Sequence, residues 1–121
     1  MNTVAIRGAI TVEQNTSEDI LNNTTELIKE IEKRNNIEKS KVIGIIFSST
    51  KDLNTEYPAK AARAMGYLNT ALMCFNEMGV KGGLNKCIRL MMLYNSNQNQ
   101  EEIKHIYLKG AKILRPDLDK E

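Results

Sequence analysis

The chain has 121 residues and a mass of 13.7 kDa, a length typical of one domain. Hydrophobic residues make up 41% and charged residues 26% of it, as in ordinary globular proteins, so a disordered chain is excluded. The formal net charge of +2 argues against a general polyanion binder. With no Trp, 2 Phe and 4 Tyr, the chain also has few rings on which nucleotide bases could stack. We therefore expect a single domain over residues 1–121 that binds no nucleic acid.

Charge is distributed unevenly along the chain. Residues 1–56 contain 7 Lys/Arg and 9 Asp/Glu, a net charge of −2, whereas residues 57–121 contain 10 and 6, a net charge of +4. The second half is therefore the part that we expect to hold a small dianion.

Cysteine and histidine are rare, and this limits the chemistry. Cys74 and Cys87 are the only cysteines, which excludes a disulfide scaffold and favours a reducing, cytoplasmic setting. The first residues lack a signal peptide, and no apolar stretch approaches the roughly 20 residues of a membrane span. His105 is the only histidine, and its spacing from the two cysteines matches no zinc motif. We expect a cytoplasmic protein without metal or membrane contact.

The first half of the chain predicts a strand, a helix and a second strand. Thr3–Val12 alternates, with one face committed to a core: Val4, Ile6, Gly8, Ile10 and Val12. Glu18–Arg34 has apolar residues at helical spacing, with N-cap candidates Thr16 and Ser17 before it and Asn35-Asn36 to end it. Val42–Phe47 is apolar on both faces, which predicts a strand buried on both sides.

The second half predicts shorter elements. They are a short helix over Pro58–Met65, strands over Ala71–Phe75 and Lys86–Tyr94, a brief helical segment after residues 96–100, and a last strand over Ile106–Leu114 that Pro116 stops. The order predicts an α+β fold, in which a mixed sheet of about five strands carries one long and one short helix on one face. We expect the tail after residue 116 to be mobile.

Two arginines stand out among apolar neighbours. Arg7 is the only charge in the first strand and lies between Ala5 and Ala9 on its own face, so it either meets a planar anion or faces solvent. Arg89 has apolar neighbours on both faces of its strand and needs a partner, because an unpaired buried charge is very costly. That partner is either a bound anion or Glu77, the only acidic residue between Glu56 and Glu101.

Other candidates have simpler explanations. The glycines at positions 79, 82 and 83 lack the lysine-containing pattern of a phosphate-binding loop and predict a tight turn. Cys74 has no histidine near it in the sequence, so packing is a better explanation for it than nucleophilic catalysis. Tyr107 and Arg115, a neutral and a charged donor, are predicted to share one side of the last strand.

Four separated segments resemble, in order and spacing, the monofunctional AroH-class chorismate mutases. These segments are Ile6–Glu13, Pro58–Arg63, Glu77–Arg89 and His105–Leu118, and the resemblance covers nearly the whole chain. It implies a homotrimer of α+β subunits in a pseudo α/β barrel, with active sites between neighbours. It also implies conversion of chorismate, a small dianion, to prephenate without a cofactor.

The resemblance assigns roles residue by residue. Arg89, Glu77 and Arg7 are implied to be catalytic, with Arg89 at the ether oxygen and Glu77, together with Cys74, at the ring hydroxyl. The implied substrate-binding residues are Tyr107, Cys74, Arg63, Lys60, Tyr57, Met73, Leu114 and Arg115, of which Tyr57, Lys60 and Arg63 come from the adjacent subunit. Tyr57 and Met73 replace a Phe and a small polar residue of the family pattern, and the segment between Arg63 and Cys74 is one residue shorter. These departures bear on the lining of the pocket.

The residues suit a pericyclic rearrangement, which needs no nucleophile, acid, base or metal. A cation fixed where negative charge develops binds the transition state more tightly than the substrate, and this difference accelerates the reaction. Two alternatives remain at this level: a trimeric enamine/imine deaminase of similar subunit shape, and a trimer that senses an anion without converting it. Strands that are apolar on both faces, in a chain with too few helices to cover them, also favour a trimer.

Overall fold

The computed structural model describes residues 1–117, and its central element is a mixed sheet of five strands. The strands are β1 (Asn2–Thr11), β2 (Val42–Ser49), β3 (Ala71–Asn76), β4 (Cys87–Ser96) and β5 (Ile106–Leu108). The helices are α1 (Ser17–Asn35) and α2 (Ala59–Ala64), and the short 3₁₀ helices are η1 (Lys39–Lys41), η2 (Gln100–Glu102) and η3 (Lys109–Leu114). The strand order is β3-β2-β4-β1-β5, with β4 antiparallel to β1 and β2, and the outer pairs β1/β5 and β2/β3 parallel. The predicted α+β architecture is confirmed.

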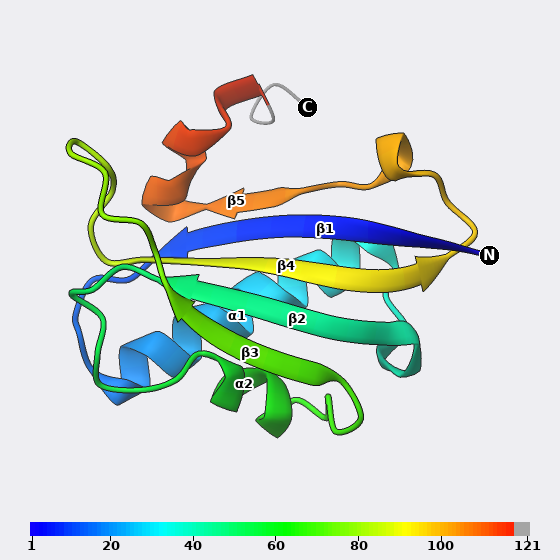
Figure 1. Ribbon diagram of the computed structural model, residues 1–121, viewed down its shortest axis with the longest axis horizontal. Coiled ribbons are helices and arrows are strands. Elements are labelled where there is room, and N and C mark those ends of the chain that lie inside the picture. Colours follow the sequence, from blue (N-terminus) through cyan, green and yellow to red (C-terminus); the bar gives the residue numbers. More distant parts are fainter. Residues whose placement is uncertain (118–121) are drawn as a thin grey trace.

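Both α-helices pack on the same side of the sheet. In Figure 1, α1 runs behind the central strands and α2 lies beside β3, while the face toward the viewer carries no α-helix. We call this second side the open face of the sheet. Within residues 1–117, no helix is long and apolar enough to cross a membrane.

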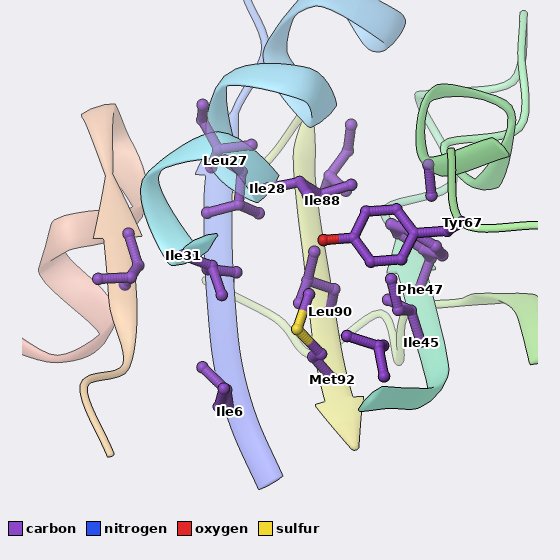
Figure 2. Close-up of a cluster of buried hydrophobic side chains, with 14 of the residues drawn as sticks. Ile6, Leu27, Ile28, Ile31, Ile45, Phe47, Tyr67, Ile88, Leu90 and Met92 are labelled. Carbon is purple, nitrogen blue, oxygen red and sulfur yellow. The ribbon is translucent and has the colours of Figure 1, made fainter. Parts of the chain in front are cut away.

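The core lies between the sheet and α1. The predicted inward face of β1 is buried along its whole length, from Val4 to Val12. Figure 2 shows Leu27, Ile28 and Ile31 of α1 directed at the buried side chains of the strands, among them Ile6 and Ile88. Each fully buried aliphatic side chain of this kind contributes about 1.5–3 kcal/mol to folding, so this contact holds the two layers together.

The ends of α1 follow the predicted capping. The hydroxyl of Thr16 accepts the N–H of Asp19 at 3.1 Å, and the acidic residues Glu18 and Asp19 occupy the first turn. Asn36 adopts the left-handed conformation, with φ 51°, and its N–H bonds to the carbonyl of Glu32. These contacts set the length of the helix.

The last strand is shorter than the sequence predicts. β5 ends at Leu108, and Lys109 turns the chain with φ 54° into η3, so the predicted alternation over Ile106–Leu114 is wrong. The reason is that Leu108 pairs with Ile10 and the partner strand β1 ends one residue later, at Thr11. The hydroxyl of Thr11 then accepts the N–H of Gly110 at 2.9 Å, where a longer strand would have needed a backbone partner.

Within one chain, the central strands are covered on one side only, and the predicted burial of Val42–Phe47 on both faces requires a second chain, so it stays a prediction. Ile45 and Phe47 are fully buried beneath the helices, whereas Ile46 on the open face is 39% exposed. In β4, likewise, Met92 is buried and Met91 is 37% exposed. A single chain therefore leaves an apolar sheet face in contact with solvent.

The expected mobility of the tail mostly concerns residues 118–121, which lie outside the described residues.

Candidate active site

The open face carries four of the predicted site residues in two aligned rows: Arg7, Met73, Arg89 and Tyr107. The first row crosses all five strands in the order Tyr107, Ala9, Arg89, Ser48 and Phe75. The second row lies two residues further along each strand and consists of Arg7, Met91, Ile46 and Met73. Because side chains alternate along a strand, both rows point away from the helices. The sheet therefore presents two arginines at diagonal positions of the neighbouring strands β1 and β4, on a largely apolar surface.

Arg89 and Glu77 form the charged centre of this face. The Nε of Arg89 lies 3.1 Å from Oε1 of Glu77, and the same oxygen accepts the hydroxyl of Ser48 at 2.6 Å. The buried Nε–H of Arg89 makes no hydrogen bond, so its contact with Glu77 is an ion pair without hydrogen-bond alignment. Both side chains remain partly exposed, at 34% and 24%. The internal partner anticipated for Arg89 is present, and the pair is still accessible to a ligand.

A cavity of about 500 Å³ opens beside this ion pair. Arg89 and Glu77 line it together with residues 50–52 and the loop that follows β3. The predicted tight turn in that loop is confirmed, because the N–H of Gly83 bonds to the carbonyl of Val80 at 3.0 Å and Gly82 has φ 84°. The loop forms one wall of the cavity.

Tyr107 and Arg115 meet near the other end of the open face. Tyr107 is 8% exposed and packs with Ala9, Cys87 and Ala111, with Leu114 alongside. Arg115 follows η3 and donates two hydrogen bonds to Asp117, from Nε at 3.1 Å and from Nη2 at 3.0 Å. These bonds raise the pKa of Arg115, with a smaller contribution from Tyr107. The turn into η3 thus brings together two residues that the sequence placed on one strand.

Arg7 is exposed on the open face, and a side chain holds its backbone in place. Its N–H donates to Nδ1 of His105 at 3.0 Å. Burial lowers the pKa of His105, and the charges of Arg115 and Arg7 lower it further. The neutral imidazole that results can accept this hydrogen bond.

A second cavity, of about 610 Å³, lies between α2 and β3. It is lined by Glu56, Tyr57, Ala59, Lys60, Arg63, Leu72, Met73 and Cys74. Pro58 starts the helical backbone, so α2 places Lys60 and Arg63 one turn apart at the cavity. All the residues that the resemblance assigned to the adjacent subunit gather here.

Glu56 organises this second cavity. Hydrogen bonds from the N–H of Tyr57 and the hydroxyl of Ser17 lower the pKa of Glu56, as does the charge of Lys60, whose Nζ lies 3.4 Å from Oε2. The sequence analysis missed Glu56, although its spacing of four residues from Lys60 is typical of a helical ion pair.

Cys74 lies with the second group and not with Glu77. It pairs with Phe47 in the sheet and faces the helices, so it opens into the cavity that contains Arg63. Burial raises the pKa of its thiol, an effect partly offset by a hydrogen bond with the backbone of Ala59. The thiol is therefore protonated near neutrality, as expected for a packing or hydrogen-bonding residue.

The predicted residues thus form two groups in one chain. The open-face group contains Arg7, Glu77, Arg89, Tyr107, Leu114 and Arg115, and the α2 group contains Tyr57, Lys60, Arg63 and Cys74. Met73 lies on the open face of the edge strand β3 and also borders the α2 cavity. Ser48 and His105, which orient Glu77 and Arg7, were missed because only strand pairing brings them into contact with those residues. Among residues 1–117, no three His, Cys, Asp or Glu side chains gather to hold a metal ion.

This arrangement defines a class of site, in which fixed cations, neutral donors and the carboxylates of Glu77 and Glu56 suit a small organic anion. The family model described as chorismate mutase type I matches residues 3–118. The chain is 43% identical over 114 residues to the chorismate mutase AroH of Bacillus subtilis (strain 168), covering 93% of this chain and 90% of that protein. It is 40% identical over 115 residues to the chorismate mutase AroH of Thermus thermophilus, covering 94% of each.

A solved structure supports the same conclusion. A chorismate mutase from Clostridium thermocellum superposes with a TM-score of 0.88 at 51% identity, covering 90% of this chain and 97% of that one. The chain therefore belongs to the chorismate mutase type I family. Its activity is that of an isomerase acting on chorismate, and this excludes the alternatives of an imine deaminase and an anion sensor.

Proposed function

We propose that the rearrangement takes place between subunits of a homotrimer, where the open-face group of one subunit meets the α2 group of the next. The observation that carries this proposal is the separation of the two groups into different cavities of one chain. Each cavity alone has only part of the donor set that a dianion with two carboxylates requires. Residues from two chains complete it.

The exposed apolar residues of the open face support the trimer. Met73 is 58% and Phe75 53% exposed, and Ile46 and Met91 lie between them and the arginines. A contiguous apolar patch on a sheet face indicates a surface that another protein covers. A second copy of this chain is the occupant that also completes the site, and three copies produce the pseudo α/β barrel of the family.

Arg89 and Glu77 are suited to stabilise the transition state. As the ether C–O bond of chorismate breaks ahead of C–C bond formation, negative charge gathers on the enolpyruvyl oxygen and positive charge on the ring. The guanidinium of Arg89 donates to that oxygen, because it is 34% exposed and lines the cavity beside Glu77. Glu77, oriented by Ser48, accepts from the ring hydroxyl and offsets the positive charge.

The remaining residues hold the dianion in its compact reactive shape. Arg7 and Tyr107 bind one carboxylate from the open face, and Arg63 and Lys60 approach from the neighbouring subunit. Tyr57, Met73 and Cys74 line the pocket on that side, while Leu114 and Arg115 border the entrance. The rearrangement is unimolecular and pericyclic, so it needs no cofactor. Binding in the compact conformation lowers the entropy cost of reaching the transition state. The two free cysteines support a reducing, cytoplasmic location.

Mixing inactive subunits tests the shared site. Arg7→Ala and Arg63→Ala proteins should each lose turnover, measured as ultraviolet loss of chorismate. Mixed trimers should regain part of it, because some interfaces combine an intact Arg7 with an intact Arg63.

A matched pair of variants serves as the control. Mixing Arg7→Ala with Arg89→Ala should restore nothing, because both residues lie on the open face of one subunit and every interface then lacks one of them. Absence of recovery in the first mixture, with subunit exchange demonstrated, would count against the shared site.

A further inference from the structure

Side chains form hydrogen bonds with the backbone of β1 along its edge next to β5, in the part of β1 that precedes the paired residues. Backbone pairing with β5 starts at Gly8 and Ile106. Ahead of it, the side-chain amide of Gln100 accepts the N–H of Ala5 at 2.8 Å and donates to the carbonyl of Ala5 at 2.6 Å. The next position along that edge is Arg7, whose N–H donates to Nδ1 of His105. The imidazole therefore takes the place of a strand carbonyl directly at the candidate substrate ligand.

The segment that carries His105 is itself anchored. The side chain of Asn35, at the end of α1, donates to the carbonyl of Lys104 at 2.9 Å and accepts the N–H of Lys104 at 2.9 Å. Asn35 is 7% exposed, so these bonds are shielded from water. His105 is thereby fixed on its N-terminal side by the anchored Lys104. On its C-terminal side the chain continues directly into β5, which carries Tyr107.

We propose that His105 is a positioning residue for Arg7, acting as a neutral imidazole with its proton on Nε2. Its Nδ1 holds the Arg7 backbone at the point where the guanidinium leaves the sheet toward a substrate carboxylate. This inference rests on the carboxylate-binding role proposed above for Arg7. His105 does not touch substrate in this arrangement, and its effect on binding passes through Arg7.

The charge state of His105 follows from its surroundings. Burial lowers the pKa of His105 below 6.5, and the two charged groups that act on it, the cations Arg115 after η3 and Arg7 on β1, lower it further. Protonation would direct an N–H on Nδ1 at the N–H of Arg7 and break the hydrogen bond. The pKa of His105 is lower in the folded state than in the unfolded state. The stability that the neutral imidazole contributes through this hydrogen bond is therefore fully present above pH 6.5, and it is lost as the pH falls through the folded-state pKa.

Nuclear magnetic resonance can test the tautomer directly, because His105 is the only histidine in the chain. Long-range ¹H–¹⁵N spectra of the ¹⁵N-labelled protein near pH 7.5 should show the Nε2–H tautomer, with Nδ1 shifted as a hydrogen-bond acceptor. Titration should give a midpoint below 6.5. A proton on Nδ1, or a midpoint at or above 6.5, would overturn the proposal.

Kinetics test whether the contact matters for Arg7. Loss of one backbone hydrogen bond corresponds to about 3- to 10-fold in an equilibrium constant, so the KM for chorismate should rise by that factor as the pH falls from 7.5 through the midpoint that the titration gives for His105. His105→Asn keeps an acceptor near the position of Nδ1 but does not titrate, so its KM should stay low and flat. His105→Phe keeps a ring without an acceptor, and its KM should be raised at every pH. Lys104→Gln, a charge change next to His105, should leave the pH dependence of the original protein in place.

Comparison of the Arg7 and His105 variants distinguishes the carboxylate-binding role of Arg7 from the positioning role of His105. If Arg7→Ala leaves KM unchanged, the role of Arg7 fails; if Arg7→Ala raises KM and His105→Phe does not, only the role of His105 fails. In the double variant, His105→Phe should add little to Arg7→Ala, because the two residues act through one contact. A KM that falls at low pH would mean that the imidazolium attracts the dianion directly, and would overturn the positioning role.

Discussion

Arg89 combines a fixed position with a guanidinium that remains 34% exposed. It lies on β4, the middle strand of the sheet, and its Nε is buried without a hydrogen bond although Glu77 is 3.1 Å away. Replacement by citrulline keeps the shape and removes the charge. We expect kcat to fall by roughly 100- to 1,000-fold with a modest change in KM, since one such donor supplies about 3 to 4 kcal/mol to the transition state. Steady-state kinetics of the semisynthetic protein measure this effect.

Two further variants of Arg89 separate charge from geometry. Arg89→Ala should lose at least as much activity as the citrulline protein, and Arg89→Lys should recover part of it if a point charge is sufficient. Should citrulline or Ala leave kcat within twofold in a correctly folded protein, Arg89 would be only the structural partner of Glu77.

Unlike Arg89, Cys74 is expected to line the pocket without stabilising the charge that develops in the reaction, because its thiol takes no part in bond formation. Cys74→Ser should keep activity within about an order of magnitude, equivalent to ~1.4 kcal/mol of barrier. Burial raises the thiol pKa, so alkylation by iodoacetamide near pH 7.5 should be slow compared with a free thiol. Complete loss of turnover in a folded Cys74→Ser protein would contradict this role.

The contact between α1 and β1 depends on a position without a side chain. A Cβ at Gly8 would lie 3.0 Å from Cδ1 of Ile31 and 3.2 Å from the carbonyl oxygen of Ile106. Gly8→Ala should therefore lower the free energy of unfolding by about 1–3 kcal/mol, because the helix or β5 must move away. Chemical denaturation followed by circular dichroism measures the loss.

Gly79→Ala is the matched control for this substitution. A Cβ at Gly79 meets no atom within 4 Å, so the unfolding free energy should change by less than about 0.5 kcal/mol. Equal stability of the two variants would show that Gly8 does not set the packing of α1.

For the whole molecule, the open face decides the state of assembly. Ile46 lies between Met91 and Met73 on this face and is 39% exposed in a single chain. Ile46→Glu is tolerated by an isolated subunit but buries a charge at the proposed interface, which is costly without a partner. Analytical ultracentrifugation should show dissociation of the trimer, with loss of turnover and retention of helix content.

Lys29→Glu, on the exposed side of α1, changes the charge on the helical layer and should leave assembly and activity intact. An Ile46→Glu protein that sediments like the original and keeps its activity would show that this face is not the interface.

The sequence by itself determined the elements whose pattern is local. The alternation from Val4 to Val12 identified the buried face of β1, and the helical spacing with Thr16 and Asn36 identified α1 and its ends. It also identified Arg7 and Arg89 as unusual, because a charge among apolar neighbours needs a partner wherever the chain folds.

Only the tertiary structure decided where the last strand ends, what orients Arg7 and Glu77, and which residues share a cavity. β5 ends because β1 continues only one residue beyond their last pair, to Thr11. The acceptor for the N–H of Arg7 is His105, 98 positions away. Ser48 on a neighbouring strand donates a hydrogen bond to Glu77. Cys74 lines a different cavity from Glu77, although it lies only three positions earlier in the chain. The physical reason is that periodicity and capping act within one or two turns of chain, whereas register and side-chain contacts depend on which strands become neighbours.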